Sequence, residues 1–184
     1  MKQLALALAL ATTCAFATPA LAMSSGGMET LEARVEATDA AHQARADMVE
    51  AFGDTTIAPG KYLWRDVPAS AGEERVVISL GDQMAYLYRG DTLVAASTVS
   101  SGKPGKDTPG GIFFVMEKKP MHRSRKYDNA PMPWMQRIDN YGIALHTGHN
   151  PGRPASHGCV RLPDSFAKKL YSVTSVGTPV LIGA

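Results

Sequence analysis

From Arg75 onward the sequence repeats short apolar runs of strand length, separated by turns rich in glycine and proline. Valine and isoleucine are the commonest residues of these runs, and both favour β-strands. Gly81-Asp82 separates the runs 76–78 and 84–88, a pattern typical of a β-hairpin. Further runs lie at 92–99, 112–116, 134–138, 142–146 and 179–182. Many short strands predict a mainly β domain with a sandwich-like or barrel-like architecture.

One late helix interrupts this strand pattern. Pro163 fits the first position of a helix over 164–173, and Phe166, Leu170 and Val173 share its inward face. A second, longer helix is predicted at 28–52. Its apolar stripe consists of Met28, Leu31, Val35, Ala41, Ala44, Met48 and Phe52, and Gly53 is a good C-terminal stop. This helix either packs on its own domain or binds a partner, and the alanines in its stripe favour the first interpretation.

Residues 1–22 have the features of a secretory signal peptide. Lys2 supplies the positive start, 4–11 the apolar core, and Ala20-Leu21-Ala22 the cleavage site. The apolar run is too short to span a membrane well, so we expect no transmembrane anchor after cleavage. The predicted organisation is a signal peptide (1–22), a helical segment with linker (23–72) and a catalytic domain (73–184). Export predicts a periplasmic protein.

Charge and cysteine content narrow the function further. Removal of Lys2 with the signal peptide leaves 18 basic and 17 acidic residues, a balance that gives no case for nucleic-acid binding. The chain has two cysteines, and Cys14 leaves with the signal peptide. Cys159 then remains as a single thiol without a disulfide partner, although the compartment is oxidising.

Cys159 lies within a stretch that carries the parts of a cysteine nucleophile. A free thiol is only about 3% thiolate at pH 7, so it needs a base. His146 follows the apolar run 143–145, and a histidine at the end of a buried strand is held firmly enough to take the thiol proton. Thr147 or its carbonyl would orient the ring. His157 lies in the turn beside Cys159 and is better placed to shape that turn.

Three further expectations concern this stretch. Gly158 lets the backbone approach substrate, and the amides of Gly158 and Cys159 are candidate oxyanion donors. An imidazolium at His146 would depress the pKa of the thiol. The alternatives are a zinc site or a small buried cysteine. The spacing of His146, His149, His157 and Cys159 is unusual for zinc, and we expect no metal and no cofactor.

The polar segment 117–133 is too long for a simple hairpin and is predicted to be a lid or binding wall. Its end carries Met132, and Trp134 follows, so both are candidate apolar substrate contacts. Trp134 equally fits a strand that fills the core. The basic residues of the segment are suited to attracting an acidic peptide, although a run of charged residues is usually only a solvent-exposed surface.

His146-Thr147-Gly148, followed by Ser156-His157-Gly158-Cys159-Val160-Arg161, resembles the signature of the L,D-transpeptidase catalytic domain, a family of bacterial cell-wall enzymes. The segments 97–102 and 108–113 match further motifs of the family, and the resemblance covers about 74–183. It implies the same mainly β fold and places Ser156 and Arg161 as candidate substrate-binding residues.

The resemblance implies that Cys159 attacks a peptidoglycan stem peptide, expels its terminal D-alanine and holds the rest as a thioester. An amine on a second stem peptide or on a protein then releases it, which contributes to peptidoglycan cross-linking, cell-wall organisation and cell shape. One rival is hydrolysis of the same acyl-enzyme, which would make the protein a carboxypeptidase or endopeptidase. The other is a non-catalytic wall-binding module.

Overall fold

The computed structural model describes residues 27–53 and 56–184. The predicted signal peptide, including Cys14, lies outside these residues. Within them, no helix is both long and apolar enough to cross a bilayer. The elements are α1 (Leu31–Phe52), β1 (Tyr62–Trp64), a 3-10 turn (Ala69–Ala71), β2 (Glu74–Ser79), β3 (Met84–Arg89), β4 (Thr92–Thr98), β5 (Gly111–Phe114), β6 (Glu117–Arg123), β7 (Pro131–Arg137), β8 (Ala144–Thr147), β9 (Val160–Leu162), α2 (Asp164–Val173) and β10 (Pro179–Gly183).

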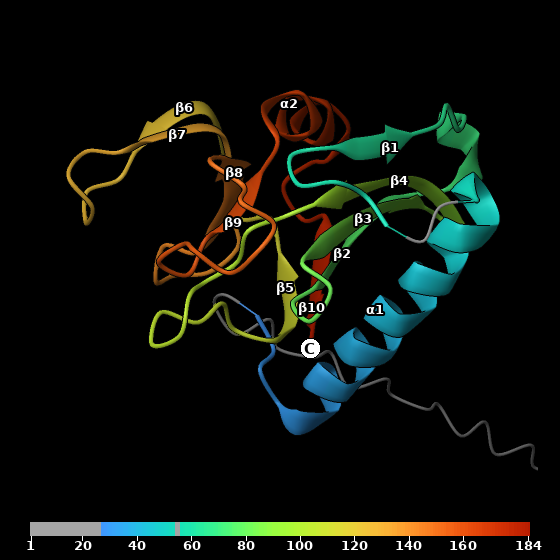
Figure 1. Ribbon diagram of the computed structural model, residues 1–184, viewed down its shortest axis with the longest axis horizontal. Coiled ribbons are helices and arrows are strands. Elements are labelled where there is room, and N and C mark those ends of the chain that lie inside the picture. The colour runs from blue at the N-terminus through green and yellow to red at the C-terminus, as the bar shows by residue number, and fades with distance from the viewer. Residues whose placement is uncertain (1–26, 54–55) are drawn as a thin grey trace, which may run out of the picture.

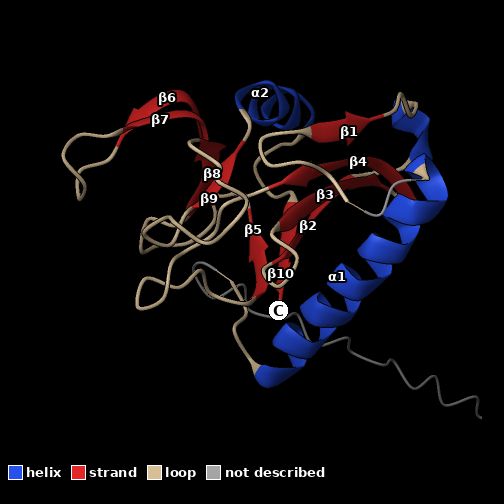
Figure 2. Cartoon of the chain, in the orientation of Figure 1, coloured by secondary structure: helices blue, strands red, loops and turns tan. Residues whose placement is uncertain are grey.

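The strands form two sheets (Figure 1). Sheet A has six strands in the order β1-β4-β3-β2-β10-β5, and sheet B has four in the order β6-β7-β8-β9. The hairpin predicted at Gly81-Asp82 is confirmed, because β2 and β3 pair antiparallel from Glu74–Arg89 to Ser79–Met84. Figure 2 shows the two helices against this mainly β body. The predicted fold class, including the late helix and the N-terminal helix, is confirmed.

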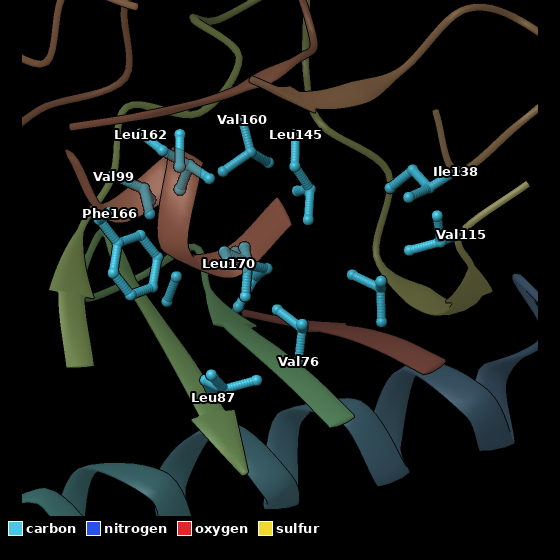
Figure 3. Packing of buried hydrophobic residues seen from close by; sticks show 14 of the residues in the cluster. Val76, Leu87, Val99, Val115, Ile138, Leu145, Val160, Leu162, Phe166 and Leu170 are labelled. Atoms are coloured by element: carbon cyan, nitrogen blue, oxygen red, sulfur yellow. The ribbon is translucent and has the colours of Figure 1, made fainter. Parts of the chain in front are cut away.

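The main core lies between sheet A, sheet B and α2. Side chains alternate along a strand, so Val76 and Ile78 of β2 point into this core while Val77 points to the opposite face. Leu145, Val160 and Leu162 enter the core from sheet B, and Phe166 and Leu170 enter it from α2. Figure 3 shows part of this layer, with Val76, Leu145, Val160, Leu162, Phe166 and Leu170 labelled and α1 on the far side of sheet A. The core therefore fixes which face of sheet B remains outside.

Helix α1 covers the other face of sheet A through small side chains. Its buried residues are Ala33, Ala37, Ala41, Ala44 and Met48. The predicted stripe is wrong at its start, because Leu31 and Val35 are 73% and 52% exposed. The helix lies too close to the sheet for larger side chains, since a Cβ on Gly183 of β10 would be 2.4 Å from the Ala37 carbonyl oxygen. The structure therefore shows a helix packed on its own domain.

Residues 117–133 are not a long loop, contrary to the prediction. Strands β6 and β7 pair antiparallel from Glu117–Arg137 to Arg123–Pro131 and form a hairpin that extends away from the body (Figure 1). The strand β6 is polar and largely exposed on both sides. It lacks the alternation that identifies a half-buried strand, because its main-chain pairing, and not an apolar face, holds it in place.

Candidate active site

The register between β8 and β9 places the candidate residues on one face of sheet B. The two strands are parallel, with Leu145 opposite Val160 and His146 opposite Arg161. Leu145 and Val160 point into the core, so their neighbours His146 and Arg161 point to the outer face. Cys159 directly precedes Val160 and shares that outer face. The structure thus brings together the two residues that the sequence predicts as base and nucleophile.

His146 is buried at 8% exposure, and one of its ring nitrogens is fixed. Its Nδ1 is 2.7 Å from the main-chain oxygen of Thr147. A carbonyl oxygen only accepts, so Nδ1 carries the proton and Nε2 is left as the acceptor nitrogen. Burial lowers the pKa of His146 to about 4; the Thr147 hydrogen bond opposes this shift, and the charges of Arg161 and His122 add to it. The imidazole is therefore neutral at pH 7.

Cys159 is partly buried at the start of β9, and its thiol packs beside Met132, Met135 and Ala144. Its Sγ donates to the carbonyl oxygen of Gly142 at 3.6 Å. Burial raises the pKa of Cys159; a hydrogen bond from the Ala144 main chain lowers it, the Asp139 charge raises it and the Arg161 charge lowers it. The net effect is a raised pKa.

These two shifts correct one expectation. The sequence predicts an imidazolium that depresses the pKa of the thiol, but the pKa of His146 is lowered and that of Cys159 is raised. Both changes have the same main cause, which is burial of a group that would carry charge. The resting pair is therefore a neutral imidazole and a neutral thiol.

Ser156 to Cys159 form a tight turn, called here the cysteine turn. Ser156 is 1% exposed, and its hydroxyl donates to the Cys159 main-chain oxygen while it accepts from the Gly158 amide at 3.1 Å. The Gly158 amide is therefore engaged, which leaves the Cys159 amide as the candidate oxyanion donor of the two. Both hydrogen bonds of the Ser156 hydroxyl are to main-chain atoms of the cysteine turn, so this side chain stabilises the conformation of the turn.

Gly158 is required by the geometry of the cysteine turn. Its φ is +115°, and a Cβ there would lie 2.6 Å from Ile143 Cδ1. The Thr108 hydroxyl donates to the Gly158 carbonyl at 2.7 Å and accepts from the Gly102 amide at 2.9 Å. The segment between β4 and β5 therefore supports the turn from behind. Thr108 belongs to the second motif of the sequence resemblance, which is the signal for this support.

His157 is exposed, unlike His146. Its ring centroid is 4.7 Å from that of Tyr127, with 31° between the ring planes. Tyr127 lies in the loop of the β6–β7 hairpin, so this contact joins the hairpin loop to the cysteine turn. The sequence gives no clear signal for Tyr127, because the contact depends on how the hairpin folds back. The segment 117–133 does reach the site, although as a hairpin.

The remaining predicted site residues fall in different places. Met132 lies beside Cys159, whereas Trp134 packs on the main core and against Tyr171 of α2 at 5.5 Å between ring centroids. The Thr147 hydroxyl donates to Asp164 at 3.1 Å, which ties β8 to α2. The aliphatic part of Arg161 lies against Gly148, since a Cβ there would be 2.8 Å from Arg161 Cγ.

Groups that could bind a metal do not gather here. Among residues 27–53 and 56–184, no set of three or more histidine, cysteine, aspartate or glutamate side chains is arranged to hold a metal ion. The arrangement instead offers a thiol, a neutral imidazole with a free acceptor nitrogen, and a main-chain amide. These groups suit nucleophilic attack by sulfur on a carbonyl carbon.

Comparison with known proteins agrees with this arrangement. Residues 73–182 match the family described as L,D-transpeptidase catalytic domain (YkuD). A putative L,D-transpeptidase YkuD of Bacillus licheniformis is 30% identical over 115 residues, which cover 59% of this chain and 64% of that protein. The crystal structure of the L,D-transpeptidase (residues 123–326) from Xylanimonas cellulosilytica is 28% identical, with a TM-score of 0.55 over 65% of this chain and 64% of that chain.

An L,D-transpeptidase from Stackebrandtia nassauensis has a TM-score of 0.57 at 24% identity, over 74% of this chain and 64% of that chain. At that identity the likeness supports the fold alone. The chain spans less than two thirds of the length of each of these three relatives.

Proposed function

Because the chain belongs to the L,D-transpeptidase catalytic domain family, we propose that it is a periplasmic cysteine acyltransferase acting on peptidoglycan. In this proposal, residues 73–184 form the catalytic domain and residues 1–22 direct export. A stem peptide is the acyl donor, and an amine on a second stem peptide or on a protein is the acceptor. The product is a cross-linked or protein-bearing cell wall.

The reaction begins with the neutral pair. Nε2 of His146 takes the proton of the Cys159 thiol as the sulfur attacks the carbonyl carbon of the third residue of the donor. The carbonyl oxygen then carries negative charge, and the Cys159 amide is placed to donate to it. The imidazolium returns its proton to the leaving nitrogen, the carbon–nitrogen bond breaks, and D-alanine departs. The donor remains as a thioester on the sulfur.

The second half-reaction reverses these roles. The acceptor amine attacks the thioester carbonyl and loses a proton to His146. The carbon–sulfur bond breaks, and the departing sulfur regains the proton from the imidazolium. One amide bond has been exchanged for another, so no cofactor is needed to balance the reaction.

The observation that carries this proposal is the tautomer of His146. The 2.7 Å contact from Nδ1 to the Thr147 oxygen fixes the ring and leaves Nε2 as the acceptor on the same sheet face as Cys159. The buried imidazole is held in one orientation and is neutral at pH 7, so its Nε2 can accept a proton. His157 lacks these properties, because it is exposed and stacked on Tyr127.

Charge distribution supports an acidic substrate. Residues 101–184 contain 12 basic and 5 acidic residues, a net charge of +7, whereas 23–100 contain 6 basic and 12 acidic residues, a net charge of −6. Three segments meet at the cysteine turn: 101–110, the β6–β7 hairpin and 148–155. Together with β9 they carry the cationic rim, which consists of Lys103, Lys106, Arg123, Arg125, Lys126, Arg153 and Arg161.

None of the cationic rim residues forms an ion pair within the described parts of the chain. Unpaired cations around one site raise the local concentration of anionic ligands. The free carboxylates of a wall peptide match this rim, and Arg161 is its member nearest the thiol.

The decisive experiment is mass spectrometry of muropeptides incubated with the protein. We expect a thioester adduct on Cys159 and then dimers joined through an amide, with both absent from Cys159→Ala. Release of shortened peptides without dimers would mean that water resolves the acyl-enzyme, and the protein would be a carboxypeptidase. Absence of an adduct, with no labelling by a thiol-acylating agent, would leave a wall-binding module.

A further inference from the structure

The connection between β7 and β8 contains a buried acid that the mechanism above does not use. Asp139 is 4% exposed. None of the ion pairs among the described residues includes it, and Arg137 reaches only its main-chain oxygen, at 2.9 Å. A buried carboxylate without a cation is costly unless hydrogen bonds satisfy it, so its presence beside a reactive thiol needs an explanation.

Asp139 organises the turn that follows it. Its Oδ1 accepts from the Tyr141 amide at 2.9 Å and from the Ile143 amide at 2.7 Å. The same turn, Asp139–Ile143, is closed by the Ile138 amide, which donates to the Ile143 oxygen at 2.9 Å. Gly142 takes a φ of +97° within it. One carboxylate oxygen therefore fixes the path of the chain from Asp139 to Ile143.

Three successive residues that follow this path, Gly142, Ile143 and Ala144, contact the cysteine turn. The Gly142 carbonyl accepts from the Cys159 thiol at 3.6 Å. The Ile143 side chain fills the space where a Cβ on Gly158 would be, at 2.6 Å. The Ala144 main chain donates toward the Cys159 sulfur. Each residue that holds the nucleophile from this side lies directly after the turn that Asp139 shapes.

We propose that Asp139 is a positioning residue, which sets the nucleophile through the Asp139–Ile143 turn that its carboxylate holds. This inference rests on the proposed function only in taking Cys159 as the nucleophile. The charged groups that act on the thiol are Arg161 from β9 and Asp139 from the turn, and His146 of β8 lies on the same sheet face. Lys106 and Asp107 approach Gly158 through their main-chain oxygens. Asp139 is the acid among these groups that raises the pKa of Cys159.

Two substitutions separate the accepting oxygen of Asp139 from its negative charge. Asp139→Asn keeps the accepting oxygen and removes the charge, so the turn stays. We expect iodoacetamide to alkylate Cys159 at least as fast as in the original protein, with transpeptidation within about threefold of the original. Asp139→Ala also removes the acceptor and is expected to lower kcat about 10²-fold, as misplacement of a catalytic group does.

Asp82→Ala is the matched control, because Asp82 shapes the β2–β3 turn of sheet A through Ser79 and pairs with Arg45. It should leave the alkylation profile and kcat unchanged. The proposal is overturned if Asp139→Asn slows alkylation and turnover as much as Asp139→Ala does, or if a folded Asp139→Ala alkylates and turns over at the original rates. Alkylation needs no peptide, so this test stands even if the proposed substrate is wrong. Should Asp139→Ala fail to fold, the Asn variant decides.

Discussion

The two sheets differ in what covers their outer faces. Helix α1 seals the outer face of sheet A with a row of alanines and Met48. Among the described residues, no helix covers the outer face of sheet B, which holds His146, Cys159 and Arg161 beside the β6–β7 hairpin. The inner faces of both sheets share a single core. A sealed sheet can therefore supply stability while the partly open sheet holds polar groups that a sealed face would exclude.

This contrast predicts its largest effects on sheet B. His146→Ala should lower kcat about 10²- to 10⁴-fold, because the general base is lost. His157→Ala should cost less, since that ring is exposed and contacts Tyr127. Added imidazole should restore part of the rate to the His146 variant only. Equal losses without rescue, or rescue of the His157 variant alone, would make His157 the base.

The second predicted effect is a pH dependence of stability that arises from the protonation of His146 in sheet B. The pKa of His146 is lowered to about 4, against about 6.5 in the unfolded chain. Between these values the unfolded state binds the additional proton, so stability is full above pH 6.5 and falls as pH drops toward 4. The 2.5-unit difference corresponds to about 3 kcal/mol. Urea unfolding at pH 7 and pH 4 should show this loss, and His146→Gln should remove most of it.

A substitution behind sheet A should lower the stability of the protein without changing the reactivity of Cys159. Ala37→Leu places a larger side chain where α1 lies against β10 and should cost about 1–3 kcal/mol of unfolding free energy. The alkylation rate of Cys159 in the folded protein should not change, because the helix is separated from the thiol by sheet A. A change in that rate at constant fold would mean that the two sheets do not divide their roles.

The smallest effect is expected on the outward face of α1. Leu31→Ser and Val35→Ser should each change the free energy of unfolding by less than about 0.5 kcal/mol, because both side chains are mostly exposed. Thermal denaturation beside Ala37→Leu would measure this difference. A loss comparable to that of Ala37→Leu would show that this face is covered in solution.

Residue patterns predicted most strands and the late helix. These patterns failed where the distance between two packed elements, or the main-chain pairing of a polar strand, determined the structure. Leu31 and Val35 are more hydrophobic than alanine, yet the close approach at Gly183 selects alanine for the buried side. The polar strand β6 lacks the alternation of apolar and polar residues by which a strand is predicted from sequence. The raised pKa of Cys159 follows from burial, which a sequence does not display.

The cysteine turn is also bonded to a segment that belongs to sheet A. Ser100 and Arg161 exchange two main-chain hydrogen bonds, each 3.0 Å long, and Thr108 supports Gly158 from the same connection between β4 and β5. The turn cannot detach from β4 without losing these bonds together. Amide hydrogen exchange at Arg161 should thus proceed only through opening of the whole domain, which makes the nucleophile one of the last parts of the molecule to loosen.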